Sequence, residues 1–276
     1  MVSGQQDLQE FLHRRLHGMN AFTEFAVSTA KEAGQLLKSR LNTPHTINYK
    51  GVINLVTEAD RMSETLILER LQKRFPDHSF LTEESPAGDK DPECRWIIDP
   101  LDGTTNYAHG YPVFCVSIAL ERRKRIVTGV VYNPMMDELF FAEEGQGAWL
   151  NGQRISVSHI SDLSRSLLAT GFPYDIRESE FNNLNYFNSL AKQAQAVRRA
   201  GSAALDMAYV AAGRFDGFWE LKLMPWDTAA ASLLIMEAGG IVSDLSGLEF
   251  SPGSPHVLAS NGKIHRQLID ALQKTP

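Results

Sequence analysis

The order of hydrophobic and polar residues predicts helices at the start of the chain. Residues 22–41 place apolar side chains three and four positions apart, which is the spacing of one helical face. A second helix is expected to begin near Thr57, because Thr57 and Asp60 have the spacing of a capping box and an apolar face follows them. Pro76 and Asp77 should end that helix.

Short apolar runs predict a sheet in the middle of the chain. They fall at residues 79–82, 95–98, 113–120, 126–132 and 138–142. Asn151 and Gly152 stand between apolar residues, and this pair is typical of a two-residue hairpin turn. The basic run at 122–125 joins two of the expected strands, so we interpret it as a solvated turn rather than as a site for nucleic acid.

The second half of the chain mixes strands with helices. Strands are expected at 166–170, 215–221 and 257–260, and helices at 181–196, 203–212, 227–238 and 263–273. This mixture indicates a protein of mixed α and β class. We divide the chain into an arm at 1–19 without an assigned role, an N-terminal α+β half at 20–160 and a C-terminal α/β half at 161–276.

Composition argues against several classes of protein. The chain has 276 residues and a formal net charge of −6, which argues against a protein that coats nucleic acid or a membrane surface. Its two cysteines, Cys94 and Cys115, are too few for a disulfide framework or a CxxC zinc site. No apolar run is long enough to span a bilayer. We therefore expect a soluble, cytoplasmic protein, with neither a membrane nor nucleic acid as its partner.

Acidic residues that follow predicted strands carry the candidate chemistry. Asp99 and Asp102 come directly after the apolar run at 95–98, and Gly103 permits a tight turn behind them. Thr104 can begin a helical turn whose first N–H groups are free. Mg²⁺ prefers oxygen ligands and often binds a few carboxylates together with a substrate phosphate. Carboxylates beside free N–H donors therefore favour a site for a metal-bridged phosphate.

Each acid also has a simpler structural interpretation. Asp227 precedes a predicted helix and is a natural N-cap, and Asp60 serves in the capping box. Glu83 and Glu84 also fit a solvated surface pair. The acids after the run at 95–98 suit a turn that contains proline and glycine. The combination, rather than any one acid, favours a metal site.

Several long strings of sequence resemble the inositol monophosphatase family, and bacterial inositol-1-monophosphatases in particular. They are DPLDGTTN at 99–106, WDTAAASLLIMEAGG at 226–240, TEES at 82–85, NLVTEAD at 54–60 and GSAALDMAYVAAGRFDGF at 201–218. The resemblance covers the chain from about Asn20 to its end. It implies an α+β fold, namely the layered αβαβα sandwich of the inositol monophosphatase and fructose-1,6-bisphosphatase type.

The resemblance also implies a phosphatase that binds two to three Mg²⁺ ions in each active site. The implied metal ligands are Glu83, Asp99, the carbonyl of Leu101, Asp102 and Asp227. Thr104 would hydrogen-bond the nucleophilic water, Asp60 would orient Thr104, and Glu83 would serve catalysis beside them. Four carboxylates in one small cleft would repel each other and partly protonate without cations, so this assignment is physically consistent.

The implied substrate contacts surround the same acids. They are Asp102, Gly103, Thr104, the backbone near Gly201 and Ala203, Glu220 and Asp227. Lys50 would lie on a mobile loop that closes over the metals. Glu220 could equally be a charge at the edge of a sheet. Arg198 and Arg199 could contact substrate phosphate or a dimer partner, or could simply be solvated.

The predicted function is Mg²⁺-dependent hydrolysis of inositol monophosphate to myo-inositol and phosphate by a metal-activated water. The resemblance further implies a lithium-sensitive homodimer acting on a small phosphorylated polyol. One alternative keeps the metal chemistry and changes the substrate to fructose-1,6-bisphosphate, a 3′-phosphoadenosine nucleotide, NADP or histidinol phosphate. A second alternative is a regulatory or RNA-associated binding protein that retains the fold.

Overall fold

The structure of the protein is a computed structural model, which describes residues 19–41, 47–49, 55–85, 90–91 and 93–275. Lys50 and residues 1–18 of the expected arm lie outside this range, so the expectations for them stay predictions. Within the described part, no helix is both long and apolar enough to cross a bilayer.

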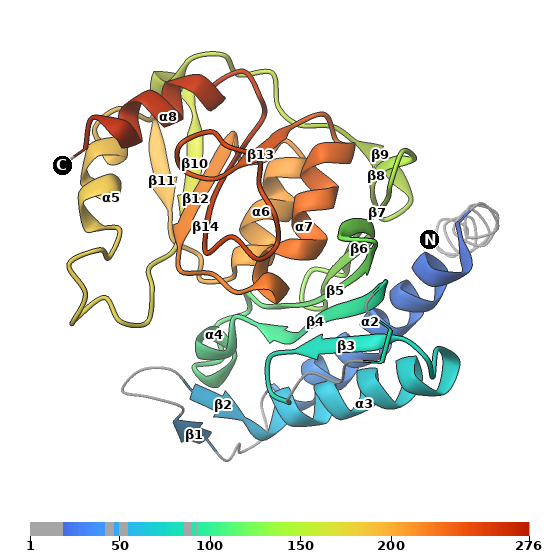
Figure 1. The fold of residues 1–276 in the computed structure, drawn as a ribbon. Coiled ribbons are helices and arrows are strands. Elements are labelled where there is room, and N and C mark those ends of the chain that lie inside the picture. The colour runs from blue at the N-terminus through green and yellow to red at the C-terminus, as the bar shows by residue number, and fades with distance from the viewer. Residues whose placement is uncertain (1–18, 42–46, 50–54, 86–89, 92, 276) are drawn as a thin grey trace, which may run out of the picture.

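The elements form five layers in which helices and sheets alternate (Figure 1). A pair of helices lies between a seven-stranded and a five-stranded sheet, and each sheet carries another pair on its outer face (Figure 1). From the N-terminal side, the pairs are α2 (Ala21–Arg40) with α3 (Glu58–Arg74), α6 (Ala203–Ala211) with α7 (Pro225–Glu237), and α5 (Leu184–Ala191) with α8 (His265–Gln273). This arrangement confirms the expected αβαβα sandwich.

The larger sheet follows the order of its strands along the chain. Its members are β3 (Ser79–Thr82), β4 (Cys94–Asp102), β5 (Cys115–Arg122), β6 (Arg125–Asn133), β7 (Glu138–Glu143), β8 (Gly147–Leu150) and β9 (Gln153–Ile155). Only its first pair, β3 with β4, is parallel. Asn151 and Gly152 have φ angles of 48° and 78°, which confirms the hairpin expected at this pair.

The smaller sheet has a crossed strand order. Its order is β11 (Ala196–Arg198), β10 (Leu167–Thr170), β12 (Gly217–Leu221), β14 (His256–Ser260) and β13 (Ile241–Ser243). β12 is therefore the central strand, with β10 parallel to it and β14 antiparallel. Four short elements complete the described chain, namely the antiparallel pair β1 (Ile47–Tyr49) and β2 (Leu55–Thr57), the helix α4 (Thr104–Ala108) and the 3-10 helix η1 (Leu163–Arg165).

The helix expected at 181–196 is wrong at both ends. Asn183 has a φ of 75°, outside the helical region, so α5 begins only at Leu184. Beyond Ala191, the N–H groups of Gln195 and Ala196 donate to the carbonyl of Ser166, at 3.0 and 3.4 Å. These bonds draw the chain into β11 at the edge of the sheet. Tertiary hydrogen bonding thus overrides a helical pattern of apolar residues.

Small residues let α7 pack closely on the larger sheet. Ala229, Ala230 and Ala231 are fully buried. A Cβ added to Gly129 on β6 would lie 2.4 Å from the carbonyl oxygen of Ala230, so only glycine fits at this contact. The close approach fixes α7, whose first turn carries Asp227, against the strands that carry the other acids.

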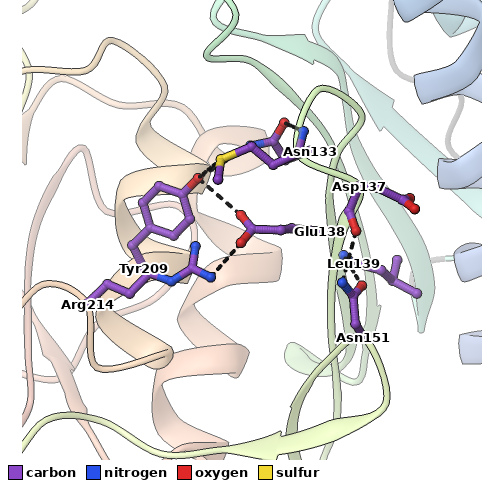
Figure 2. Close-up of polar contacts among 8 residues, drawn as sticks. Asn133, Asp137, Glu138, Leu139, Asn151, Tyr209 and Arg214 are labelled. Carbon is purple, nitrogen blue, oxygen red and sulfur yellow. Dashed lines mark hydrogen bonds and ion pairs between the residues drawn. The ribbon is translucent and has the colours of Figure 1, made fainter. Parts of the chain in front are cut away.

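A polar cluster joins the larger sheet to α6. Glu138, at the start of β7, is ion-paired with Arg214 and lies 3.3 Å from the hydroxyl of Tyr209 (Figure 2). Asn133 donates to the same hydroxyl at 3.3 Å. Figure 2 shows Tyr209 and Arg214 reaching toward Glu138 from the helical layer. The cluster therefore ties the end of α6 to the β6–β7 turn.

Candidate active site

An irregularity at the end of β4 brings two acids to one cleft. Residues three positions apart on a regular strand face opposite sides of the sheet. Asp99 is paired with Ser117 and Asp102 with Cys115, so two residues on β4 oppose a single residue on β5. This is the two-to-one count of a β-bulge. The bulge allows Asp99 and Asp102 to line the same cavity, and β4 extends beyond the run at 95–98 that the sequence predicts.

A glycine turn separates these acids from α4. Gly103 has a φ of 97°, and a Cβ on it would lie 2.9 Å from the carbonyl oxygen of Val113. Both observations require glycine at this position. Thr104 then begins α4, as the sequence predicts.

Asp102 is held by the beginning of α6. Its Oδ2 accepts hydrogen bonds from the hydroxyl of Ser202 at 2.7 Å and from the N–H of Ala204 at 2.8 Å. Burial raises the pKa of Asp102, although these donors lower it. Asp102 therefore lies beside Gly201 and Ala203, as expected, and the three residues line one pocket.

Asp60 and Thr104 meet although 44 positions separate them. Asp60 is fully buried, and its Oδ2 accepts the N–H of Thr57 at 2.8 Å, which confirms the capping box. Its Oδ1 lies 2.9 Å from the Thr104 hydroxyl, which is also 3.0 Å from the carbonyl oxygen of Leu101. Burial raises the pKa of Asp60, and its hydrogen bonds oppose that shift. Asp60 thus fixes the orientation of the Thr104 side chain.

Asp227 is not the N-cap that the sequence predicts. The N-cap of α7 is Met224, whose N–H donates to Oδ2 of Asp227 at 2.6 Å. Pro225 accounts for the earlier start, because proline suits the first helical position and lacks the N–H that would be unpaired there. Asp227 therefore lies within the first turn, where one oxygen caps the helix. Its Oδ1 accepts no hydrogen bond from the described residues.

These acids line one cavity of about 360 Å³. Its acidic members come from four elements or their ends: Glu83, Asp99, Asp102, Glu220 and Asp227. Burial, and then the charges of the neighbouring acids, raises the pKa of Asp99 well above its ordinary value. Burial and then the charge of Asp102 do the same for Asp227. Acids outnumber the single lysine, Lys222, in the lining of this cavity, so it suits a cation.

The oxygens of this cavity match the preference of Mg²⁺ for hard ligands. In the described residues, however, no three His, Cys, Asp or Glu side chains already stand together as a metal-binding group. Uncompensated carboxylates repel each other, and the raised pKa values report that repulsion. The donor set thus fits Mg²⁺ in chemistry, whereas its members stand apart.

A smaller pocket of about 100 Å³ continues from this cavity. Glu220 reaches into it from β12, which lies in the centre of its sheet, so the interpretation as an edge charge is wrong. Burial, followed by the charge of Asp206, raises the pKa of Glu220 to about 8, and Arg199 opposes the shift. The carboxylate lies against Gly171, where an added Cβ would be 2.1 Å from Oε1. A side chain at position 171 would therefore displace the Glu220 carboxylate.

The sequence reasoning missed three residues at this site. Asp206 and Tyr174 line the smaller pocket, and Tyr174 and Lys222 line the larger one. Asp206 lies in the middle of a small-residue helix, and Tyr174 lies on a loop, so no local pattern pointed to either. The positive φ of 59° at Lys222 has no signal in its residue type. Only the tertiary arrangement identifies them.

The basic residues flagged in the sequence lie in different settings. Arg198 and Arg199 are both exposed, and Arg199 also lines the smaller pocket. In the hairpin at 122–125, Arg123 is ion-paired with Glu93 and Arg125 with Glu144. This agrees with the interpretation of that run as a solvated turn.

Residues 19–276 match the model of the inositol monophosphatase family. The chain belongs to this family. An inositol-1-monophosphatase of Synechocystis is 48% identical over 94% of this chain and 91% of its own length. The structure of an inositol monophosphatase from Anabaena matches with a TM-score of 0.85 and 46% identity, covering 92% of this chain and 96% of that one.

The chain is also similar to a relative whose name is not that of a phosphatase. The Escherichia coli K12 protein named Nus factor SuhB is 42% identical over 91% of this chain and 95% of its own length. Membership in the inositol monophosphatase family indicates a metal-dependent phosphatase that acts on phosphorylated substrates. The choice of substrate needs a separate argument.

Proposed function

We propose that this phosphatase hydrolyses inositol monophosphates to inositol and phosphate with Mg²⁺. The main support is that acids from three separate elements line one cavity. Glu83 follows β3, Asp99 and Asp102 lie at the end of β4, and Asp227 lies in the first turn of α7. Side chains so distant in sequence meet at a buried, negatively charged site, which costs folding free energy unless a ligand offsets it.

The residues that would hold Mg²⁺ are the four acids of the cavity and the carbonyl of Leu101. Glu83, Asp99 and the carbonyl of Leu101 would hold one ion, and Asp99, Asp102 and Asp227 would hold a second. When bound, Mg²⁺ would supply the positive charge that lowers the pKa of water and offsets the charge of the phosphate.

The chain itself would orient the reacting groups. The Thr104 hydroxyl, fixed by Asp60 at 2.9 Å, would position the attacking water. The N–H groups of Gly103 and Thr104 would hold phosphate oxygens, because the turn at Gly103 leaves the first amides of α4 without helical partners. Glu220 and the backbone near Gly201 would bind the polyol in the smaller pocket. Lys50 remains a predicted loop residue outside the described structure.

The variant Asp99→Asn tests this proposal. It removes one charged oxygen from the centre of the acidic cavity, so kcat/KM for inositol 1-phosphate should fall on the order of a hundredfold at saturating Mg²⁺. Phosphate release measures the rate, and titration with Mn²⁺ followed by electron paramagnetic resonance measures cation binding.

The matched control is Asp162→Asn, because Asp162 caps a short exposed turn away from both pockets. It should keep the activity and the cation binding of the unchanged protein. Unchanged phosphate release and Mn²⁺ binding in Asp99→Asn would contradict the proposed site.

The relative named Nus factor SuhB favours a second candidate, a regulatory or RNA-associated role on the same fold. A gel-shift assay with RNA over a range of salt concentrations tests it, since phosphate contacts weaken as salt rises. Salt-dependent retention would support the second role. The alternative phosphate esters are tested in the same phosphate-release assay. A homodimer, sensitivity to Li⁺ and a cytoplasmic location stay predictions of the family resemblance.

A further inference from the structure

The smaller pocket contains a buried acid, Asp206, that has no role in the proposed mechanism. Asp206 lies on α6, is 1% exposed and lines this pocket. Its Oδ1 has no hydrogen-bond partner among the described residues. A carboxylate without a donor is unfavourable in the interior of a protein, because it has lost its contact with water. The chain therefore keeps a polar group whose partner is not part of the fold.

The nearest cation does not satisfy Asp206. Arg199 lies close enough to lower the pKa of Asp206, which burial and the charge of Asp102 raise. Among the described residues, however, no ion pair joins Arg199 to Asp206. A Cβ on Gly201 would lie 2.7 Å from Nη1 of Arg199, so the guanidinium packs against this glycine. Arg199 balances charge in the pocket and leaves the oxygen of Asp206 unbonded.

We propose that Asp206 is a specificity-determining residue that binds a hydroxyl group of the substrate's leaving group. This inference rests on the proposed function and names the part of the substrate that the smaller pocket selects. A hydroxyl suits Asp206 in either protonation state, because it can donate to a carboxylate and accept from a carboxylic acid. An aryl or alkyl edge in the same place leaves the acid unpaired.

The size and charge of the pocket support a hydroxyl over a second phosphate. A volume of about 100 Å³ has room for one edge of a polyol ring. Asp206 and Glu220 face the single cation Arg199, so the pocket does not carry the positive charge that a second phosphate needs. The pocket thus favours a monophosphate of a polyol over a bisphosphate.

The test compares two phosphate esters in the full-length protein. Asp206→Leu keeps the branched shape of the side chain, with methyl groups in place of the carboxylate oxygens, and removes its hydrogen bonding. The kcat/KM for inositol 1-phosphate, divided by that for 4-nitrophenyl phosphate, should fall about tenfold or more, mainly through KM. Asp206→Asn should restore part of the ratio, because an amide can donate to and accept from a hydroxyl.

The control is Asp216→Asn. Asp216 is also buried, but it accepts the N–H of Leu167 at 2.7 Å and lies outside both pockets. This substitution should change kcat/KM for the two esters by the same factor. The thermal midpoint of Asp206→Leu should equal or exceed that of the unchanged protein if the larger side chain is accommodated, because an unpaired buried polar group is removed.

An unchanged ratio in Asp206→Leu would overturn the inference, as would an equal fall in both rates. If that variant does not fold, Asp206→Ala is judged by the same ratio. The proposed function fails separately, if the unchanged protein releases no phosphate from inositol 1-phosphate at saturating Mg²⁺.

Discussion

Gly171 leaves the space that the Glu220 carboxylate fills. The backbone of Gly171 does not need a positive φ, so alanine is disfavoured there only by contact. That contact is severe, because the new Cβ would lie 2.1 Å from Oε1 and 2.4 Å from Oε2 of Glu220. Since Glu220 is buried, its head group has to move within the pocket that is proposed to receive the polyol.

We expect Gly171→Ala to raise KM for inositol 1-phosphate about tenfold, the effect of losing one hydrogen bond to a charged group. Steady-state kinetics with inositol 1-phosphate measures it. Gly253→Ala is the matched control, because an added Cβ there meets only the Ser251 hydroxyl at 3.7 Å. A KM equal to that of the control would mean that Glu220 does not contact the substrate.

Residue type and motif predicted part of this site, and geometry supplied the rest. Asp99, Asp102 and Asp227 were candidates because acids near glycine and helix starts suit metal chemistry. Their convergence on one cavity agrees with that prediction, while their role as ligands stays a prediction. Asp206 and Gly171 could not be found in this way, because their significance lies in a missing partner and a close approach, and neither leaves a mark in the local sequence.

At the scale of elements, a single lysine anchors the loop between β10 and α5. Lys222 Nζ lies 2.6 Å from Oδ2 of Asp175 and 2.8 Å from the Ser179 hydroxyl. Tyr174, next to Asp175, lines both pockets. Lys222 follows the end of β12, so it ties this part of the pocket wall to the central strand of the sheet.

We expect Lys222→Met to loosen this loop. KM for inositol 1-phosphate should rise by about threefold, because a partly exposed ion pair contributes modestly, and trypsin should cleave faster after Arg177. Kinetics and timed proteolysis measure the two effects. Lys263→Met, two residues before α8, provides the control. Equal cleavage rates in the two variants would contradict the role of Lys222 as an anchor.

The limits of several elements could not be predicted from local pattern. The predicted helix at 203–212 and strand at 79–82 match α6 and β3 to within one residue, because local composition and tertiary packing favour the same element there. β4 continues to Asp102 because the bulge keeps it paired with β5. β13 was not predicted, since three residues at the edge of a sheet give too short a pattern to recognise.

At the scale of the whole molecule, His265 couples stability to pH. It begins α8, and its ring nitrogens lie 2.9 Å from the hydroxyls of Ser243 on β13 and Ser260 on β14. Burial lowers the pKa of His265 below its ordinary value of 6.5. Between these two pKa values the unfolded chain binds the proton and the folded protein does not, so stability rises with pH there.

Relative to His265→Asn, the free energy of unfolding of the unchanged protein should therefore hold above pH 6.5 and fall below it, by up to about 1.4 kcal/mol for each pH unit. Urea unfolding of both proteins between pH 7.5 and 5 measures this difference. His78 and His256, whose pKa values burial lowers, and Glu220, whose pKa burial raises to about 8, titrate in both proteins and drop out of the difference. Parallel curves for the two proteins would exclude a contribution from His265.

The overall architecture followed from the resemblance of long motifs rather than from periodicity. Alternating patterns indicated mixed α and β structure, but they carried no information on strand order or on which helices lie between the sheets. The order β11, β10, β12, β14, β13 depends on contacts between residues far apart in the chain. Such contacts are set by packing of the whole core.

The close contact between Gly129 and Ala230 makes the middle layer a spacer of fixed thickness. Asp227 belongs to α7, whereas Asp99 and Asp102 belong to the larger sheet. An added methyl group at Gly129 would increase the distance between Asp227 and the pair formed by Asp99 and Asp102. If these carboxylates hold a cation as proposed, a larger side chain at position 129 would weaken cation binding as well as the packing of α7 on the sheet.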